Sequence, residues 1–298
     1  MTAETDLSKP RIWLLAARPK TLWAGIVPVV IGGAIAYDTG VFHTLSFVFA
    51  FIGSVLIQVG TNFANDLFDY LKKVDDSERI GPLRVTQAGL VSPKKMKFAT
   101  MAMFTLAFLI GIYLVWRGGI PIVIIGLSSI LFGILYTAGP YPLGYHGLGD
   151  VFVLIFYGPV AVCGTYYVVT LDYNATVLLA GLPPGMLSAA ILTVNNLRDY
   201  DTDSRTGKKT LAVRFGRSFA RVEYILFLVV AALFPLIISL CDGTHPYSIL
   251  TALILIPGAS VVKAVLTESS GEVLNGTLAK TGGLLALYGL LFSVGWML

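Results

Sequence analysis

The side chains with the clearest chemical potential lie in the segment NFANDLFDYLKKVD, residues 62–75. Asn62, Asp66 and Asp69 follow one another at intervals of four and three residues, and Asn65 directly precedes the first aspartate. These intervals place side chains on one face of a helix. Because the preceding residues are apolar, and carboxylates at membrane depth are costly, we expect this face to line a polar cavity.

A second cluster of the same composition lies in NNLRDYDTDSRTGKKTLAVRFG, residues 195–216. Asn195, Asp199 and Asp203 stand four residues apart, and Asn196 follows the first of them. Membrane bundles that arose by duplication commonly build one central site from corresponding elements of their two halves. We therefore interpret the two clusters as the halves of one shared site.

The ligand chemistry of these clusters indicates Mg²⁺ as the cofactor. Carboxylate and amide oxygens are hard ligands, and Mg²⁺ typically takes one or two carboxylates together with water and substrate phosphates. Neither cluster contains the histidine or cysteine that zinc and copper sites favour. The residues that we expect to bind the metal and to serve catalysis are Asp66, Asp69, Asp199 and Asp203.

Basic residues near both clusters indicate that the metal meets a polyanion. The residues that we expect to bind this substrate are Asn62, Asn65, Arg79, Arg84, Asn195, Asn196, Arg198, Lys208 and Lys209. Diphosphate, Mg²⁺ and a membrane cavity together favour a lipid-linked diphosphate. Metal ions and fixed cations stabilise the charge on a departing diphosphate. We therefore expect loss of diphosphate from an allylic chain, followed by attack of a nucleophile on the carbocation.

Composition and apolar runs identify an integral membrane protein. Of the 298 residues, 56% are hydrophobic and 13% are charged, whereas soluble domains carry about 25% charge. About 20 apolar residues span a bilayer as a helix. Nine runs approach that length, near residues 21–37, 44–65, 98–116, 119–136, 151–171, 176–197, 219–241, 247–264 and 280–298. The expected fold is all-α, with about nine transmembrane helices around a central cavity, in a single domain covering residues 1–298.

The distribution of Lys and Arg predicts the orientation, because these residues stay on the cytoplasmic side of short loops. Of the 21, all but Arg117 fall on one side of a nine-helix arrangement, together with both clusters and the loop at 137–150. We expect a multi-pass protein of the cell inner (plasma) membrane, with its N-terminus and active-site loops in the cytoplasm. The net charge of +4 reflects this asymmetry, so the expected partners include the lipid bilayer and no nucleic acid.

On these residues the chain resembles the UbiA-type superfamily of intramembrane prenyltransferases. The first motif of that family, NDxxD, falls on Asn65, Asp66 and Asp69, and the second, DxxxD, falls on Asp199 and Asp203. The resemblance implies nine helices around a central cavity, with both motifs binding diphosphate through Mg²⁺.

The position of the next aspartate makes the chain similar to the MenA-like branch of the family. Asp75 stands further from Asp66 than in many members and is followed by RIGPLR (79–84). A helix would turn Asp75 to the far face, so we do not expect it to bind metal. ARPKTL (17–22) and LGYHGLGD (143–150) strengthen the resemblance. It implies that a polyprenyl diphosphate prenylates 1,4-dihydroxy-2-naphthoate, with loss of its carboxylate, to give demethylmenaquinol.

Two alternatives stay open at this point. A related aromatic prenyltransferase would transfer phytyl for phylloquinone, or use 4-hydroxybenzoate or homogentisate as its acceptor. A secondary transporter would also combine repeats with polar membrane residues, but transporter sites lie near the bilayer midplane. Both acidic clusters lie at helix ends instead, which favours the enzyme.

Overall fold

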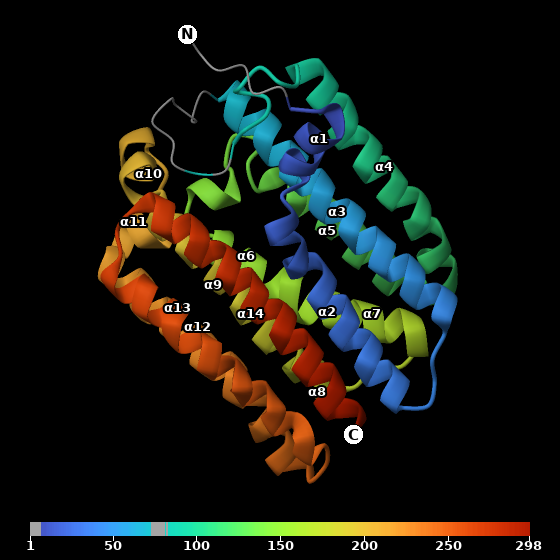
Figure 1. Ribbon diagram of the computed structural model, residues 1–298. Helices are drawn as coiled ribbons and strands as arrows, with labels where there is room; N and C mark the ends of the chain where they lie inside the picture. The colour runs from blue at the N-terminus through green and yellow to red at the C-terminus, as the bar shows by residue number, and fades with distance from the viewer. Residues whose placement is uncertain (1–6, 73–80, 82) are drawn as a thin grey trace.

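The computed structural model describes residues 7–72, 81 and 83–298, and all regular elements in these residues are helical (Figure 1). In chain order they are α1 (Lys9–Ala17), α2 (Pro19–Asp38), α3 (Thr44–Leu71), α4 (Pro93–Gly118), α5 (Ile120–Leu135), η1 (Leu143–Tyr145), α6 (Gly149–Ile155), η2 (Phe156–Val160), α7 (Ala161–Thr170), α8 (Ala175–Ala180), α9 (Leu182–Arg198), α10 (Tyr200–Thr206), α11 (Leu211–Phe215), α12 (Arg217–Asp242), η3 (Pro246–Ile254), α13 (Leu255–Thr267) and α14 (Gly271–Met297).

Eight helical stretches in the described part of the chain are long and apolar enough to cross a membrane. Helix α5 occupies the remaining predicted run, and it is shorter at 16 residues. Three of the spans combine consecutive elements, which are α6 with η2 and α7, α8 with α9, and η3 with α13. The predicted all-α bundle of about nine membrane helices is therefore confirmed.

Local sequence explains where several helices begin and end. Helix α4 begins at Pro93, a residue suited to the first helical turn, and the Ser92 side chain accepts a hydrogen bond from the backbone N–H of Lys95. A single residue, Gly119, separates α4 from α5. Its φ of +67° lies in a region that residues with a Cβ rarely adopt, so glycine allows this reversal.

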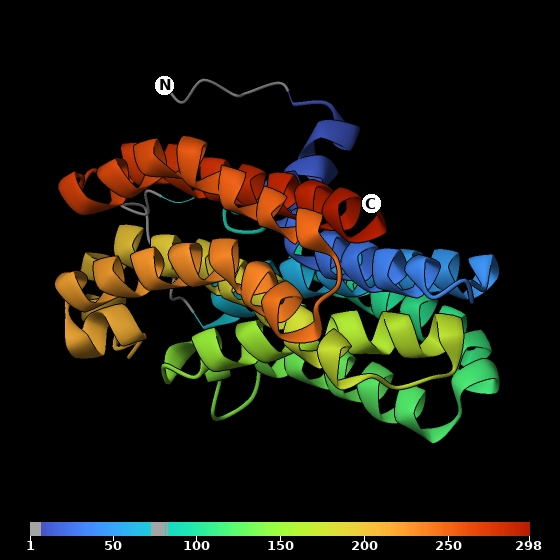
Figure 2. The same cartoon turned by 90° about the horizontal axis from the view of Figure 1, so that it is seen from below.

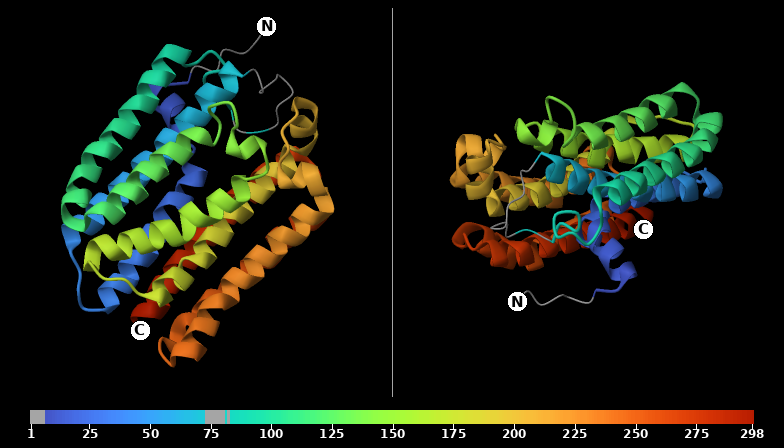
Figure 3. Two further views of the ribbon diagram at one scale, coloured as in Figure 1. Left: turned by 180° about the vertical axis from the view of Figure 1, so that it is seen from behind. Right: turned by 90° about the horizontal axis from the view of Figure 1, so that it is seen from above.

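The helices share a buried apolar core and also enclose a cavity. Helix α14 packs on α2 and α9, α12 packs on α9, and α3 packs on α4. Figures 2 and 3 show α14 on the side of the bundle opposite α4 and α5. Helices α1, α10 and α11 and the end of α3 gather at one end of the bundle (Figure 1). Both predicted motifs lie at this end, which we call the acidic end.

The span that contains η2 is distorted at a position facing the interior. Gly158 has the non-helical angles φ −124° and ψ −112°, and Pro159 follows it. A Cβ on Gly158 would stand 2.6 Å from the carbonyl oxygen of Gly181, so only glycine permits this close approach to α8 and α9. Wide helical turns of this kind occur often at functional sites. Tyr157, which precedes the distortion, lines the cavity.

Candidate active site

A cavity of about 620 Å³ runs from the acidic end into the bundle. Away from that end its wall is mostly apolar. In this apolar region α4 and α5 contribute residues such as Leu114, Val115, Ile122 and Ile130. The polar residues at the acidic end include Asn65, Asp69, Arg84, Tyr145, Asn195, Asn196, Asp199, Asp203 and Lys208. The cavity thus joins a charged mouth to a chamber suited to a hydrocarbon chain.

Asp69 of α3 is the carboxylate of the first motif that lines this mouth. It is 2% exposed. The Arg84 guanidinium donates to its Oδ2 at 2.5 Å, and the Tyr145 hydroxyl donates to its Oδ1 at 2.5 Å. Two segments that are distant in sequence therefore meet at one carboxylate.

Asp66 lies beside the cavity and does not contribute to its lining. It is 1% exposed, and its two oxygens accept hydrogen bonds from the backbone N–H groups of Val85 and Thr86, each at 3.1 Å. The carboxylate therefore holds the segment that carries Arg84 against α3. Its metal-ligand role stays a prediction, and this geometry supports a positioning role instead.

The second motif begins at a break between α9 and α10. Asp199 is the residue between the two helices. Arg198 donates to both of its oxygens, at 2.8 Å from Nε and 2.6 Å from Nη2. The same guanidinium donates to Asn195 at 2.7 Å and to Asn275 of α14 at 2.8 Å. The Arg198 side chain is fully buried and does not line the cavity, so it fixes Asp199 from behind.

Asp203 and Lys208 line the mouth beside the Tyr145 ring, and Lys72 lies next to the same ring outside the cavity lining. Lys208 Nζ lies 3.8 Å from Asp203 Oδ1 and 4.6 Å from the ring centroid. Lys72 Nζ lies 5.0 Å from the same centroid and donates to the carbonyl oxygen of Thr137 at 2.7 Å. Burial raises the pKa of Asp203 to about 6, although Lys208 opposes this. Burial also lowers the pKa of Lys72.

The remaining predicted residues have different positions. Lys209 is exposed and does not line the cavity, but its backbone N–H donates to the Tyr145 carbonyl oxygen at 2.8 Å. It thereby joins the loop at 137–150 to the second motif. Asn62 lines the cavity deeper along α3. Arg79, together with Asp75, lies outside the described residues.

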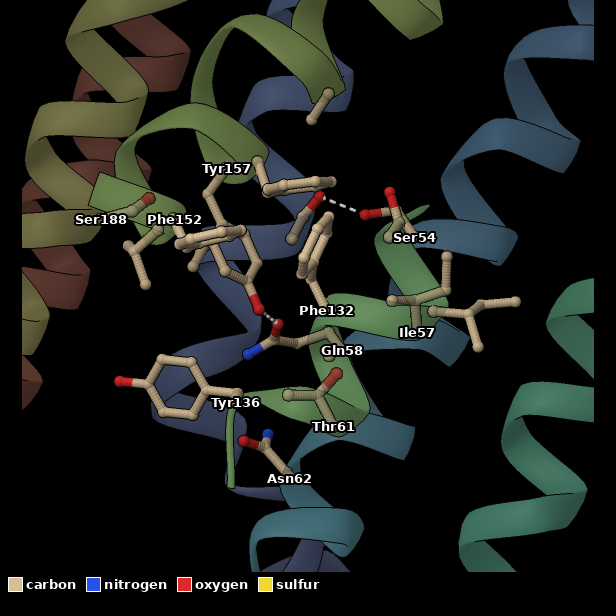
Figure 4. Close-up of a pocket in the computed structure, with 18 of the residues that line it drawn as sticks. Ser54, Ile57, Gln58, Thr61, Asn62, Phe132, Tyr136, Phe152, Tyr157 and Ser188 are labelled. Carbon is tan, nitrogen blue, oxygen red and sulfur yellow. Dashed lines mark hydrogen bonds between the residues drawn. The ribbon is translucent and has the colours of Figure 1, made fainter. Parts of the chain in front are cut away.

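The predicted site did not include Lys72, which lies beside the Tyr145 ring outside the cavity lining, or Gln58, which lines the cavity. At middle depth the Tyr157 hydroxyl donates a hydrogen bond to Gln58 Oε1. Figure 4 shows these two side chains facing each other below Ser54. Their signal in the sequence was weak, because Gln58 and Tyr157 are isolated in apolar runs.

The donor set at the mouth fits Mg²⁺ held jointly with a diphosphate. Within the described ranges, no three carboxylate, histidine or cysteine groups lie close enough to form a metal site by themselves. Asp69, Asp199 and Asp203 nevertheless face one cavity from two motifs. Mg²⁺ requires few protein carboxylates when phosphate and water complete its shell, so an incomplete set of hard oxygen ligands suits it.

Comparison with known proteins gives consistent matches over nearly the whole chain. A family model described as the UbiA prenyltransferase family matches residues 26–273. The chain is 35% identical to a 1,4-dihydroxy-2-naphthoate octaprenyltransferase of Haemophilus influenzae, over 97% of both chains. It is 37% identical to the protein of the same description in Escherichia coli, over 76% of this chain and 75% of that one.

A solved structure shares the fold at low sequence identity. It is described as a UbiA homolog from Archaeoglobus fulgidus bound to GPP and Mg²⁺. The two chains superpose with a TM-score of 0.67 at 16% identity, over 96% of this chain and 100% of the other.

Proposed function

The chain belongs to the UbiA prenyltransferase family, and from that premise we propose that it prenylates 1,4-dihydroxy-2-naphthoate. A polyprenyl group would move from an allylic polyprenyl diphosphate to the acceptor, with loss of CO₂ and diphosphate, to give demethylmenaquinol. The observation that carries the proposal is the single cavity in which both acidic motifs line one end and apolar helices line the rest. The activity in the relatives' descriptions supports the acceptor. Residues 1–298 would act as one prenyltransferase domain.

The mouth would bind the diphosphate. Asp69, Asp199 and Asp203 would hold Mg²⁺, which neutralises negative charge on the departing diphosphate when bound. Arg84 and Lys208 line the same mouth and would contact the phosphate oxygens directly. Their positions beside carboxylates keep them fixed before substrate arrives, and preorganised cations stabilise developing charge most effectively.

The bond changes balance without a proton acceptor. The allylic C–O bond breaks, and its electron pair leaves with the diphosphate. The ring carbon that bears the carboxylate then bonds to the allylic C1. The bond from this ring carbon to the carboxylate breaks, CO₂ leaves, and the electron pair restores the aromatic ring. Because the carboxylate charge cancels the carbocation charge, no base has to remove a ring proton.

The middle of the cavity would protect the carbocation. Phe132, Tyr136, Phe152 and Tyr157 surround it (Figure 4). The face of an aromatic ring carries partial negative charge and attracts cations. The apolar surroundings also exclude water, which would otherwise capture the carbocation as an alcohol.

The proposed setting is the inner (plasma) membrane with the acidic end in the cytoplasm. The excess of Lys and Arg at that end supports this orientation. In a background of Cys163→Ser and Cys241→Ser, an impermeant thiol reagent should label His146→Cys and Thr206→Cys only from the cytoplasmic side. Labelling from outside would contradict the orientation.

The function is tested with purified protein in detergent, without a membrane gradient. Reactions would pair octaprenyl, geranyl or phytyl diphosphate with 1,4-dihydroxy-2-naphthoate, 4-hydroxybenzoate or homogentisate. We expect Mg²⁺-dependent release of diphosphate and CO₂, with a prenylated product, for naphthoate and a polyprenyl donor. Turnover with phytyl diphosphate or a benzoate acceptor alone would indicate another activity of the family. No diphosphate release with any pair would reject a prenyltransferase.

A further inference from the structure

Three basic side chains line the described part of the cavity, and they do so from different places. Arg84 and Lys208 lie at the mouth, where they pair with Asp69 and Asp203 respectively. Arg18 reaches the cavity from the junction between α1 and α2. The chain therefore presents a cation to the cavity from an element that belongs to neither acidic motif.

The backbone of Arg18 is held in a conformation that arginine seldom adopts. It is the single residue between α1, which ends at Ala17, and α2, which begins at Pro19. Its angles, φ 52° and ψ 69°, lie in the left-handed region, which is uncommon for residues other than glycine. Such conformations cost free energy and cluster at functional sites. The backbone conformation of this single-residue joint therefore sets where the Arg18 side chain leaves the main chain.

Side chains of α3 hold this joint against the cavity. Asn62 Nδ2 donates to the carbonyl oxygen of Ala17 at 2.9 Å and to Thr21 Oγ1 at 3.2 Å. Thr21 Oγ1 in turn donates to the carbonyl oxygen of Arg18 at 3.0 Å. Gln58 Nε2 donates to the carbonyl oxygen of Thr21 at 3.2 Å. Asn62 therefore acts on the joint through its amide.

The joint lies at the depth where an acceptor ring must meet the prenyl donor. Asn62 precedes Asp69 by seven residues of one helix, which is about 10 Å along the axis. A diphosphate at the mouth would place its allylic carbon on the chamber side of Asp69. An acceptor at the level of Asn62 would then lie beside that carbon, with Arg18 on the α1–α2 side.

We propose that Arg18 binds the carboxylate of the aromatic acceptor and that Asn62 positions it by holding the α1–α2 joint. This inference rests on the proposed function. A guanidinium binds a carboxylate through two parallel hydrogen bonds, which fix its orientation as well as its position. The ring carbon that bears the carboxylate is also the carbon that bonds to the prenyl group. Holding the carboxylate therefore aligns the reacting carbon and selects acceptors that carry this group.

Binding and kinetics of Arg18→Gln and Arg18→Lys test the proposal. The matched control is Arg11→Gln, which changes an exposed arginine of α1 outside the cavity lining. Calorimetry in detergent would compare 1,4-dihydroxy-2-naphthoate with 1,4-dihydroxynaphthalene, which lacks the carboxylate. We expect Arg18→Gln to weaken naphthoate binding at least ~10-fold, as for loss of a charged hydrogen bond. Binding of 1,4-dihydroxynaphthalene should be unchanged.

The kinetic readout separates the acceptor from the donor. Arg18→Gln should raise the KM for naphthoate and leave the KM for the prenyl diphosphate within about twofold. Arg18→Lys keeps the positive charge but cannot donate two parallel hydrogen bonds, so its rise in the KM for naphthoate should be intermediate. Asn62→Asp keeps the size but cannot donate to Ala17, so it should also raise the acceptor KM.

The possible outcomes are distinct. Wild-type naphthoate affinity in Arg18→Gln would overturn the inference while leaving the prenyltransferase activity intact. A rise in the KM for prenyl diphosphate alone would assign Arg18 to the diphosphate and overturn it as well. If Arg18→Gln does not fold, the affinity of Arg18→Lys for naphthoate tests the proposal instead. A naphthoate affinity equal to that of the wild type would reject bidentate binding of the carboxylate by the Arg18 guanidinium. A wild-type protein that leaves naphthoate unprenylated would reject both the proposed function and this inference.

Discussion

The two acidic motifs are similar in sequence but are held in place by different means. Asp69 of the first motif lies on the uninterrupted helix α3, and its partners, Arg84 and Tyr145, come from later segments of the chain. Asp199 of the second motif lies at a helix break, and its main partner is the adjacent Arg198. The first motif is thus completed by tertiary contacts, and the second is largely built by local ones.

This difference assigns separate tasks to the basic residues. Arg84 both holds Asp69 and faces the cavity, so it is available to a substrate phosphate. Arg198 is buried between Asp199, Asn195 and Asn275 and stabilises the break from behind. The two motifs therefore line one cavity but are supported differently, and substitutions should reveal this difference.

The largest expected effect is common to both motifs. Asp69→Asn and Asp199→Asn keep side-chain size but remove a charge that we expect Mg²⁺ to require. Turnover should fall at least ~10²-fold, as for loss of a preorganised stabilising group, while the melting temperature stays close to wild type. Initial rates at saturating Mg²⁺ measure this. Near-normal turnover in both variants would reject the shared metal site.

The next largest effect shows whether Asp66 positions Arg84 or binds the metal. Asp66→Asn replaces one acceptor of the Val85 and Thr86 N–H groups with a donor. We expect about a tenfold loss of turnover, because the substitution would displace Arg84 and would not remove a metal ligand. Asp66 and Arg84 act in one network, so the effects of substituting both should not add.

Two measurements identify this route. The Mg²⁺ concentration for half-maximal rate should stay unchanged in Asp66→Asn, and the double variant with Arg84→Gln should lose little more than Arg84→Gln alone. A large rise in the required Mg²⁺ would identify Asp66 as a metal ligand instead.

A pH effect should arise in the second motif. Burial raises the pKa of Asp203 to about 6, so the carboxyl is mostly protonated below that pH and mostly ionised above it. Metal binds the ionised form, and apparent Mg²⁺ affinity should fall as pH drops through about 6, by up to about tenfold per pH unit. Titrations with Mg²⁺ between about pH 5 and about pH 8 measure this. The slope should be shallower in Asp203→Asn, and an equal slope would assign the effect elsewhere.

The smallest effect concerns an ion pair at the edge of the second motif. Arg217 Nη2 lies 2.8 Å from Asp201 Oδ2, and Asp201 is 77% exposed. Exposed pairs contribute little to stability, and this pair lies outside the cavity lining. Asp201→Asn should therefore leave turnover within about twofold and stability almost unchanged. A strong loss of activity would extend the site beyond the cavity.

Asp66 shows what helical spacing cannot predict within the first motif. Helical spacing places Asp66 and Asp69 near each other, and both are buried. Spacing does not specify which of them meets the cavity, because that depends on where the segment 83–86 packs. The same applies to Arg198 and Lys208. Both are basic neighbours of the second motif, yet only Lys208 lines the cavity.

Hydropathy and residue spacing are local properties of the chain, and they were sufficient to predict the membrane class, the helical fold and the two clusters of hard ligands. The family was also recognisable from short motifs, NDxxD at residues 65–69 and DxxxD at residues 199–203. Local properties could not predict which carboxylates face a common cavity, which cations support them, or that Arg18 lines that cavity from the α1–α2 joint. The physical reason is that these relations join residues such as Tyr145 and Asp69, which are distant in sequence and meet only when helices pack.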